Sequence, residues 1–171
     1  YNPVSYTDAV TKSDSLTNPY SGVFTATPYT AWMLVNNVTN LQGMNTNLAG
    51  NYALGANINA AGTTTWNFNG TTYDGFAPIG NIATPFTGRF NGNAYTIDGL
   101  YINRPAASYV GLFGRTNAST IKDVALTNVN ITGGSYVGSL VGWHQGTLNN
   151  SSNASGTVAG TGISSYVGGL V

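Results

Sequence analysis

Asp98 and Asp123 are the residues of this sequence whose type could support hydrolytic chemistry, with Arg89 and Arg104 as the nearby cations. Glycoside hydrolysis uses two carboxyl groups held about 5–9.5 Å apart. In parallel β-helix lyases and hydrolases, clustered Asp, Arg or Lys on adjacent turns do this work. The two aspartates are 25 positions apart, whereas the first two copies of a repeated phrase, at 108–114 and 135–142, begin 27 positions apart, so we expect the aspartates not to lie in register.

His144 is the single histidine and lies in the segment GWHQG. A catalytic histidine needs a carboxylate or a nucleophile within hydrogen-bonding distance, and neither lies nearby in the sequence. We therefore expect His144 to be an exposed turn residue. One histidine and five scattered aspartates do not predict a metal site. The sequence predicts no catalytic residue, no cofactor and no enzyme activity.

Aromatic residues next to asparagine and aspartate are candidates for glycan contact, because flat rings suit the faces of sugars. Phe68 lies among them, and the four we select are Trp66, Tyr73, Tyr101 and Trp143. The alternative is that these rings are buried beneath loops, where they would cover the end of the fold.

Charge is scarce in this chain, with only 6% charged residues and a formal net charge of zero. Nucleic-acid binding requires several clustered Lys or Arg, so we expect no nucleic-acid partner. The sequence has no apolar run of 18 residues, and we expect no membrane insertion. Its 23 Gly, 22 Asn and 23 Thr, together with 11 Tyr, favour strands and turns over helices.

One phrase occurs three times: SYVGLFG at 108–114, SYVGSLVG at 135–142 and SYVGGLV at 165–171. Repetition at a period of 20–50 residues indicates a solenoid, and this composition favours a parallel β-helix over helical repeats. We expect each Tyr to stack on its counterparts and each Val to enter the core. The structural repeat residues are Tyr109, Val110, Gly111, Tyr136, Val137, Gly138, Tyr166, Val167 and Gly168.

The remaining elements are predicted from periodicity. Residues 1–30 are expected to form an irregular N-terminal segment or linker, 31–75 a capping strand–helix–strand and loop, and 76–171 the β-helix turns. An apolar spacing of three to four residues predicts one helix at about 37–48, beginning after Asn36 or Asn37. Alternation of Tyr52, Leu54, Ala56 and Ile58 predicts a half-buried strand over 51–60. The third phrase stops where the second continues with Gly142, so we expect further repeats in the parent protein and self-association through open turn ends.

The three phrases resemble GLUG motifs, and the segments WMLVNNVTNLQGMNTNLAGNYALGANINA, FAPIGN and FTGRFNGNAYTIDGLYIN resemble filamentous-haemagglutinin-like adhesins. This resemblance implies a right-handed parallel β-helix, all-β apart from a short N-terminal capping helix. It also implies a secreted protein or one on the bacterial outer surface, active in cell adhesion and biofilm formation. GLUG motifs also occur in large surface peptidases, but the zinc motif HExxH is absent here.

We therefore expect an adhesin segment that acts as a stalk and contacts a host-cell, matrix or polysaccharide ligand. Two alternatives remain: a self-assembling fibre subunit, and a polysaccharide-active β-helix enzyme.

Overall fold

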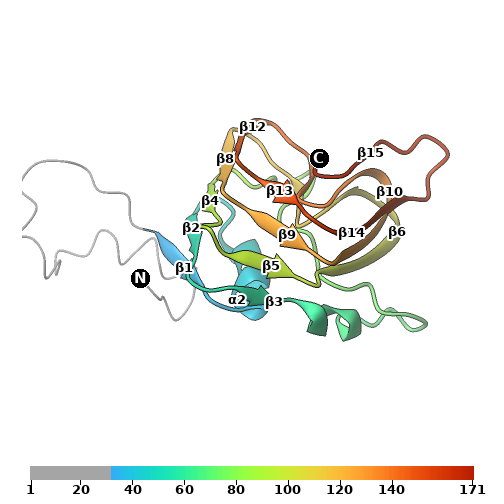
Figure 1. The fold of residues 1–171 in the computed structure, drawn as a ribbon. Coiled ribbons are helices and arrows are strands. Elements are labelled where there is room, and N and C mark those ends of the chain that lie inside the picture. Colours follow the sequence, from blue (N-terminus) through green and yellow to red (C-terminus); the bar gives the residue numbers. More distant parts are fainter. Residues whose placement is uncertain (1–31) are drawn as a thin grey trace, which may run out of the picture.

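The computed structural model describes residues 32–171, so the predicted irregular segment 1–30 lies outside the described residues (Figure 1). The described part is mostly β, with strands β1 to β15 and one short α-helix, α2. The named strands of this part pair in parallel. The predicted all-β content with one short helix is confirmed.

Four parallel sheets hold the strands. The first sheet contains β1 (Met33–Val35), β2 (Asn51–Leu54), β4 (Arg89–Asn91), β8 (Ser119–Lys122) and β12 (Gly146–Asn149). The second contains β3 (Ile58–Asn59), β5 (Thr96–Asp98), β9 (Ala125–Thr127) and β13 (Ser152–Asn153). The third contains β6 (Tyr101–Val110), β10 (Val129–Gly138), β14 (Gly156–Gly160) and β15 (Val167–Gly168), and the fourth contains β7 (Phe113–Arg115) and β11 (Val141–Trp143).

From β4 onward the chain visits the four sheets in a fixed order and then starts again. Parallel strands cannot be joined by a tight hairpin, because the chain must return to the same end of the sheet before pairing again. In this chain, the segment between two paired strands of one sheet forms strands of the other sheets. Successive turns therefore stack, as Figure 1 shows for β4, β8 and β12 at one side and β5, β9 and β13 at another.

The core consists of columns of aligned apolar side chains between the sheets. One column in the first sheet has four members. Phe90 is the register partner of Tyr52 on one side and of Ile121 on the other, and Ile121 pairs in turn with Leu148. The pairing of Ile121 with Leu148, and that of Ile131 with Val158, are those that the 27-residue repeat predicts. Each column buries apolar surface against its neighbours, at about 25 cal/mol per Å², which favours this register over a shifted one.

Helix α2 (Val38–Gly43) is shorter than predicted and is followed by a 3₁₀ turn, η1 (Met44–Thr46). Asn37 caps it as expected, since its side chain accepts a hydrogen bond of 2.8 Å from the Asn40 N–H. The early end follows from Gly43, which has a low helix propensity. The predicted apolar face still packs on the core, with Leu41 and Met44 fully buried.

The predicted strand over 51–60 is interrupted, since β2 ends at Leu54 and β3 begins at Ile58. The chain turns here from the first sheet to the second, and the alternation predicted from the sequence does not hold. Tyr52, Ala53 and Leu54 are all buried. A second 3₁₀ turn, η2 (Ala61–Thr65), follows β3 and leads into a long connection to β4.

Candidate functional site

The repeat phrases lie side by side in the third sheet. Val137 of β10 is the register partner of Val110 in β6 and of Val167 in β15. The Tyr136 ring stacks on Tyr109 at a centroid distance of 5.0 Å and an interplanar angle of 7°. It stacks on Tyr166 at 5.0 Å and 14°. The stack predicted from the repeat is present, and we call these three residues the tyrosine column.

Tyr109 and Tyr136 have φ of 63° and 54°, a left-handed conformation that is unusual for a bulky residue. This conformation bends the strand inside β6 and β10, while the following Val enters the core. Backbone strain of this kind persists only where the surroundings over-determine it. Here the partners are the stacked rings and Trp143, which meets Tyr136 at 5.2 Å and 76°.

His144 lies beside the tyrosine column and is half-buried, so the prediction of an exposed turn residue is wrong. Its Nδ1 atom is 2.8 Å from the Thr116 hydroxyl on the preceding turn, which holds the ring against the neighbouring strand. Partial burial lowers the pKa of His144 below its usual value, and a backbone hydrogen bond with Gly146 opposes this shift in part. Among the described residues no carboxylate is recorded as its hydrogen-bond or ion-pair partner.

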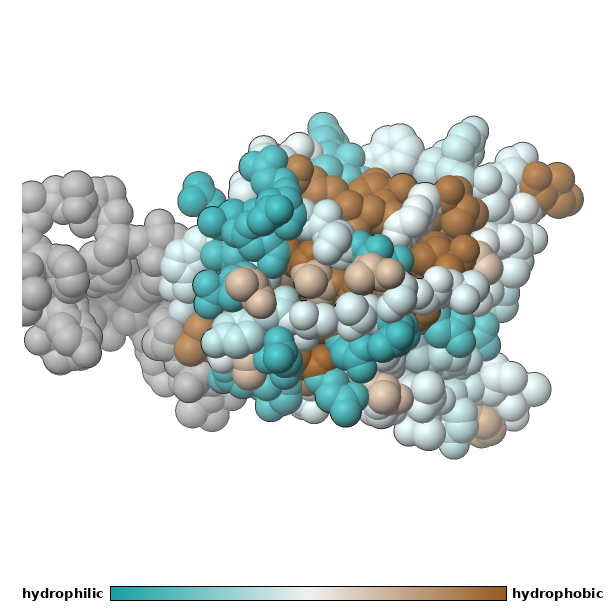
Figure 2. Space-filling view, in the orientation of Figure 1, coloured by the Kyte–Doolittle hydropathy of each residue, from teal (hydrophilic) through white to brown (hydrophobic). Residues whose placement is uncertain are grey.

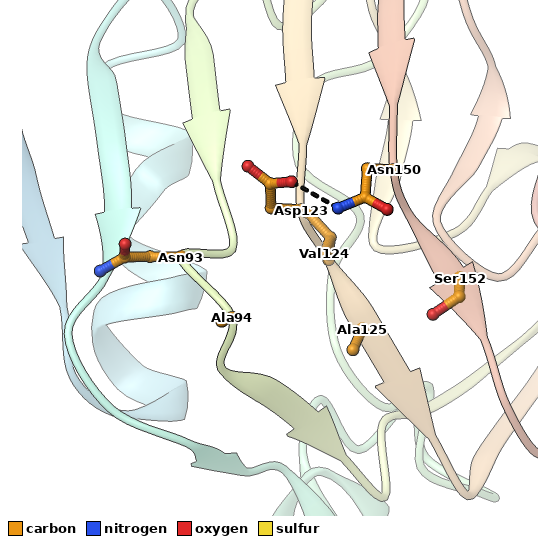
Figure 3. A pocket seen from close by; sticks show the side chains of 7 residues that line it. All are labelled: Asn93, Ala94, Asp123, Val124, Ala125, Asn150 and Ser152. Atoms are coloured by element: carbon orange, nitrogen blue, oxygen red, sulfur yellow. Dashed lines mark hydrogen bonds between the residues drawn. The ribbon is translucent and has the colours of Figure 1, made fainter.

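A polar hollow lies at the corner between the first and second sheets, where Asp123 of one turn accepts a hydrogen bond of 2.8 Å from Asn150 of the next (Figure 3). The other side chains that line it are those of Asn93, Ala94, Val124, Ala125 and Ser152. The hydrogen bond from Asn150 lowers the pKa of Asp123, burial opposes this, and nearby Lys122 adds to the lowering. The hydrogen bond between Asp123 and Asn150 therefore joins two successive turns at this corner.

Asp98 occupies a different corner. It accepts hydrogen bonds of 2.7 Å from the Thr127 hydroxyl and from the Asn128 amide, and these bonds lower its pKa. Asp98 is the register partner of Thr127, so Asp98 and Asp123 are not paired, as the spacing predicted. The two candidate cations are also apart, since Arg104 pairs with Asp74 at 3.6 Å whereas Arg89 lies in β4. No pair of carboxylates is assembled for hydrolysis among these residues.

The predicted glycan-contact residues fall into two places. Trp66, Phe68 and Tyr73 belong to the connection after β3. Tyr101, the first residue of β6, lies next to the end of this connection, because its carbonyl accepts a hydrogen bond of 2.9 Å from the Phe76 N–H. Phe68 and Tyr73 are exposed and contact each other at 5.2 Å. Trp143 is apart from them, beside the tyrosine column.

Trp66 lines a groove of about 630 Å³ between this connection and the helical segment. The other lining residues are Gln42, Asn45, Thr65, Asn67 and Ala77. Sequence reasoning missed Gln42 and Asn45, since neither belongs to a repeat or a motif. Their only signal is their position on the polar side of a short amphipathic helix.

Within residues 32–171 no group of three or more His, Cys, Asp or Glu could hold a metal ion. No helix of that part is long and apolar enough to cross a membrane.

Residues 34–156 match the family model of the M26 IgA1-specific metallo-endopeptidase N-terminal region. The chain belongs to this family. The matched residues run from β1 into β14 and so include the four sheets. The M26 match does not test the GLUG and filamentous-haemagglutinin resemblance, which stays a prediction.

Two curated relatives are similar to this member of the M26 N-terminal region. Halomucin of Haloquadratum walsbyi is 38% identical over 164 residues, which is 91% of this chain and 2% of halomucin. A putative Gly-rich membrane protein of Evansella cellulosilytica is 39% identical over 80 residues, 44% of this chain and 9% of that protein. The chain thus spans a small fraction of these relatives' length. No solved structure matches it.

Proposed function

We propose that this chain is a segment of a secreted or surface-displayed protein and serves there as a right-handed parallel β-helical stalk for adhesion. The observation that carries the proposal is the in-register stacking of the three repeat phrases, with Val110, Val137 and Val167 in one column and the tyrosines in another. Such stacking suits a protein whose task is to extend and present surface, because each turn contacts only its neighbours.

The comparisons support the surface location. One relative is named a halomucin and another a membrane protein, and the family model is named for the N-terminal region of a metallo-endopeptidase. This region would act by placing and presenting other parts of the protein, without turnover of its own. The scattered positions of Asp98, Asp123 and His144 support a role without catalysis.

The adhesion proposal is tested by displaying the chain on a non-adherent bacterium. Retention under flow is measured on films of mucin, fibronectin and cellulose, against the same bacterium displaying a non-adhesive protein of equal length. We expect retention to rise on at least one film and to remain in a His144→Gln, Asp98→Asn, Asp123→Asn triple variant. Retention no higher than that of the control on all three films would contradict adhesion.

A second candidate, a self-assembling fibre subunit, is favoured by exposed apolar side chains in and next to the third repeat phrase. Ile163, Tyr166, Val167 and Val171 are exposed, and residues 124–171 include no charged side chain. Figure 2 shows hydrophobic side chains gathered over the region where Figure 1 draws β10 and β15. Charged residues normally protect sheet edges from association. Sedimentation of the wild type and of Val167→Lys at micromolar concentration distinguishes the two candidates, because only a fibre subunit forms large assemblies that the lysine disrupts.

A further inference from the structure

The groove at Trp66 combines an aromatic ring with amide and hydroxyl side chains, and its volume of about 630 Å³ is that of a small-ligand site. We infer that this groove binds a neutral oligosaccharide, with one pyranose ring stacked on Trp66. The inference rests on the proposed adhesive function and names the class of ligand that the stalk contacts.

The Trp66 ring is held in place before any ligand arrives. It stacks on Phe76 at a centroid distance of 6.4 Å and an interplanar angle of 22°, and Phe76 is itself fully buried. Trp66 remains half-buried, so part of its ring meets the groove. A ring fixed in this way loses little conformational entropy on binding.

The amide groups of the groove are also fixed by the backbone opposite them. The Gln42 side chain donates to the Ala77 carbonyl at 2.9 Å and accepts from the Ala77 N–H at 2.8 Å. The Asn45 oxygen accepts from the Gly80 N–H at 3.0 Å, and the Asn45 nitrogen donates to the Ala77 and Pro78 carbonyls at 3.5 and 3.4 Å. A primary amide has two N–H donors and two acceptor lone pairs. Gln42 therefore retains one donor and one acceptor position for a sugar hydroxyl group, and Asn45 retains one acceptor position.

Asn67 and Thr65 complete the polar lining. The Asn67 amide donates to the Gly75 carbonyl at 2.7 Å, which orients its side chain, and the Thr65 hydroxyl donates to the Gly62 carbonyl at 3.2 Å. The oxygen atoms of both side chains can still accept a hydrogen bond from a sugar hydroxyl group.

The absence of charge among the six lining residues decides the class of ligand. Phosphorylated or carboxylated ligands are ordinarily held by Arg or Lys through charge-assisted bonds, and none lines this groove. An apolar ligand would cover the remaining hydrogen-bonding positions of the fixed amides without pairing them, which costs binding free energy. A neutral sugar offers a C–H face to the ring and hydroxyl groups to the amides.

The exposed rings of Phe68 and Tyr73 lie on the same connection as Trp66, contact each other at 5.2 Å, and offer further aromatic surface to a ligand longer than one sugar. The ligand is therefore inferred to be an oligosaccharide, of which one unit occupies the groove.

Isothermal titration calorimetry of the full chain tests the inference, with cellohexaose, mannohexaose and chitohexaose as neutral probes and polygalacturonate as the anionic one. We expect saturable binding of at least one neutral hexasaccharide and none of polygalacturonate. Trp66→Ala should weaken that binding at least about tenfold, which corresponds to about 1.4 kcal/mol. Ile163→Ala, which removes an exposed apolar side chain outside the groove lining, should leave it unchanged.

A second variant guards against loss of fold in Trp66→Ala. Ala77→Leu keeps the ring and fills the groove, and it should weaken binding by a similar factor while its circular dichroism matches the wild type. Absence of binding to all three neutral probes, preferential binding of polygalacturonate, or equal effects of Trp66→Ala and Ile163→Ala would each overturn the inference. Retention on the films in the adhesion assay without any such binding would leave the adhesive function standing and remove only this site.

Discussion

Tyr136 combines a costly backbone with well-formed side-chain contacts. Its left-handed φ of 54° costs roughly 1–2 kcal/mol in a residue with a Cβ, whereas each stacked aromatic pair contributes about 0.5–1.5 kcal/mol beyond the area it buries. With Tyr109 on one face, Tyr166 on the other and Trp143 at 5.2 Å, the contacts outweigh the strain.

Substitution of Tyr136 separates these two effects. Tyr136→Ala removes the stacks but keeps the strain, and we expect the free energy of unfolding to fall by about 2–3 kcal/mol. Tyr136→Gly removes both and should be about 1 kcal/mol more stable than the alanine variant, the reverse of the usual order in a strand. Urea denaturation measures both values. An alanine variant as stable as the glycine variant would show that the backbone at 136 is not strained.

The lowered pKa of His144 predicts a dependence of stability on pH. Because the folded pKa lies below the unfolded value of about 6.5, the unfolded chain binds the proton more tightly. The free energy of unfolding should therefore fall as the pH drops from about 6.5 toward the folded pKa, and it should be independent of this group above that range.

Denaturation at pH 8, 7, 6 and 5 checks this expectation, with His144→Gln as the control. The variant retains a polar group near Thr116 and has no proton to bind, so its stability should change less between pH 7 and 5. Parallel curves for wild type and variant would mean that the histidine titrates alike in both states.

At the scale of elements, Gly142 lets the fourth sheet approach the third closely, because it has no side chain. A Cβ on Gly142 would lie 2.5 Å from the Val110 nitrogen and 2.7 Å from the Tyr136 carbonyl oxygen, both backbone atoms that cannot turn aside. By contrast, a Cβ on Gly169 in the third phrase would meet nothing within 4 Å. The two glycines therefore have different roles within the same repeat.

Gly142→Ala should reduce the free energy of unfolding by about 1–3 kcal/mol, as overpacking does. The matched change Gly169→Ala should alter it by no more than about 0.5 kcal/mol. Thermal unfolding followed by circular dichroism measures both. Equal effects of the two changes would contradict the close approach of β6, β10 and β11 at Gly142.

At the scale of elements part of the strand pairing could be predicted from the sequence, because residues in some of the paired strands are separated by the same number of positions as the first two repeat phrases. The pairing of Ile131 with Val158 follows directly from a 27-residue period. The helix end and the break after Leu54 could not be predicted, since both depend on where the chain must turn between sheets. The Trp66 groove was predicted only in part, because the amide bonds of Gln42 join residues 35 positions apart.

At the scale of the whole molecule, the proposed β-helical stalk predicts that the protein tolerates the loss of one complete turn. Ser119 and Gly146 are register partners 27 residues apart. Deletion of residues 119–145 would join Ala118 to Gly146 and bring each later strand opposite an equivalent partner. We expect this variant to keep a β-type circular dichroism spectrum and to unfold cooperatively at a lower denaturant concentration.

A shorter deletion of residues 119–140 is the matched control, because it removes less of the chain but leaves the rest out of register. We expect it to lose the cooperative transition. If both deletions abolish folding to the same degree, the turns are not equivalent units and the β-helical stalk is wrong.

The scarcity of charge has a consequence for the lifetime of such a segment outside a cell. Trypsin-like proteases cut after Lys or Arg, and from Asp123 to Val171 the chain has neither. Glutamyl endopeptidases find no Glu at any position, and Arg104 precedes a proline, which blocks tryptic cleavage. The backbone of the paired strands is also hydrogen-bonded to neighbouring strands. A protease needs a free, extended segment of backbone, so it cannot bind these strands while they are paired. The composition that makes the surface neutral thus also leaves few sites for trypsin-like proteases and none for glutamyl endopeptidases.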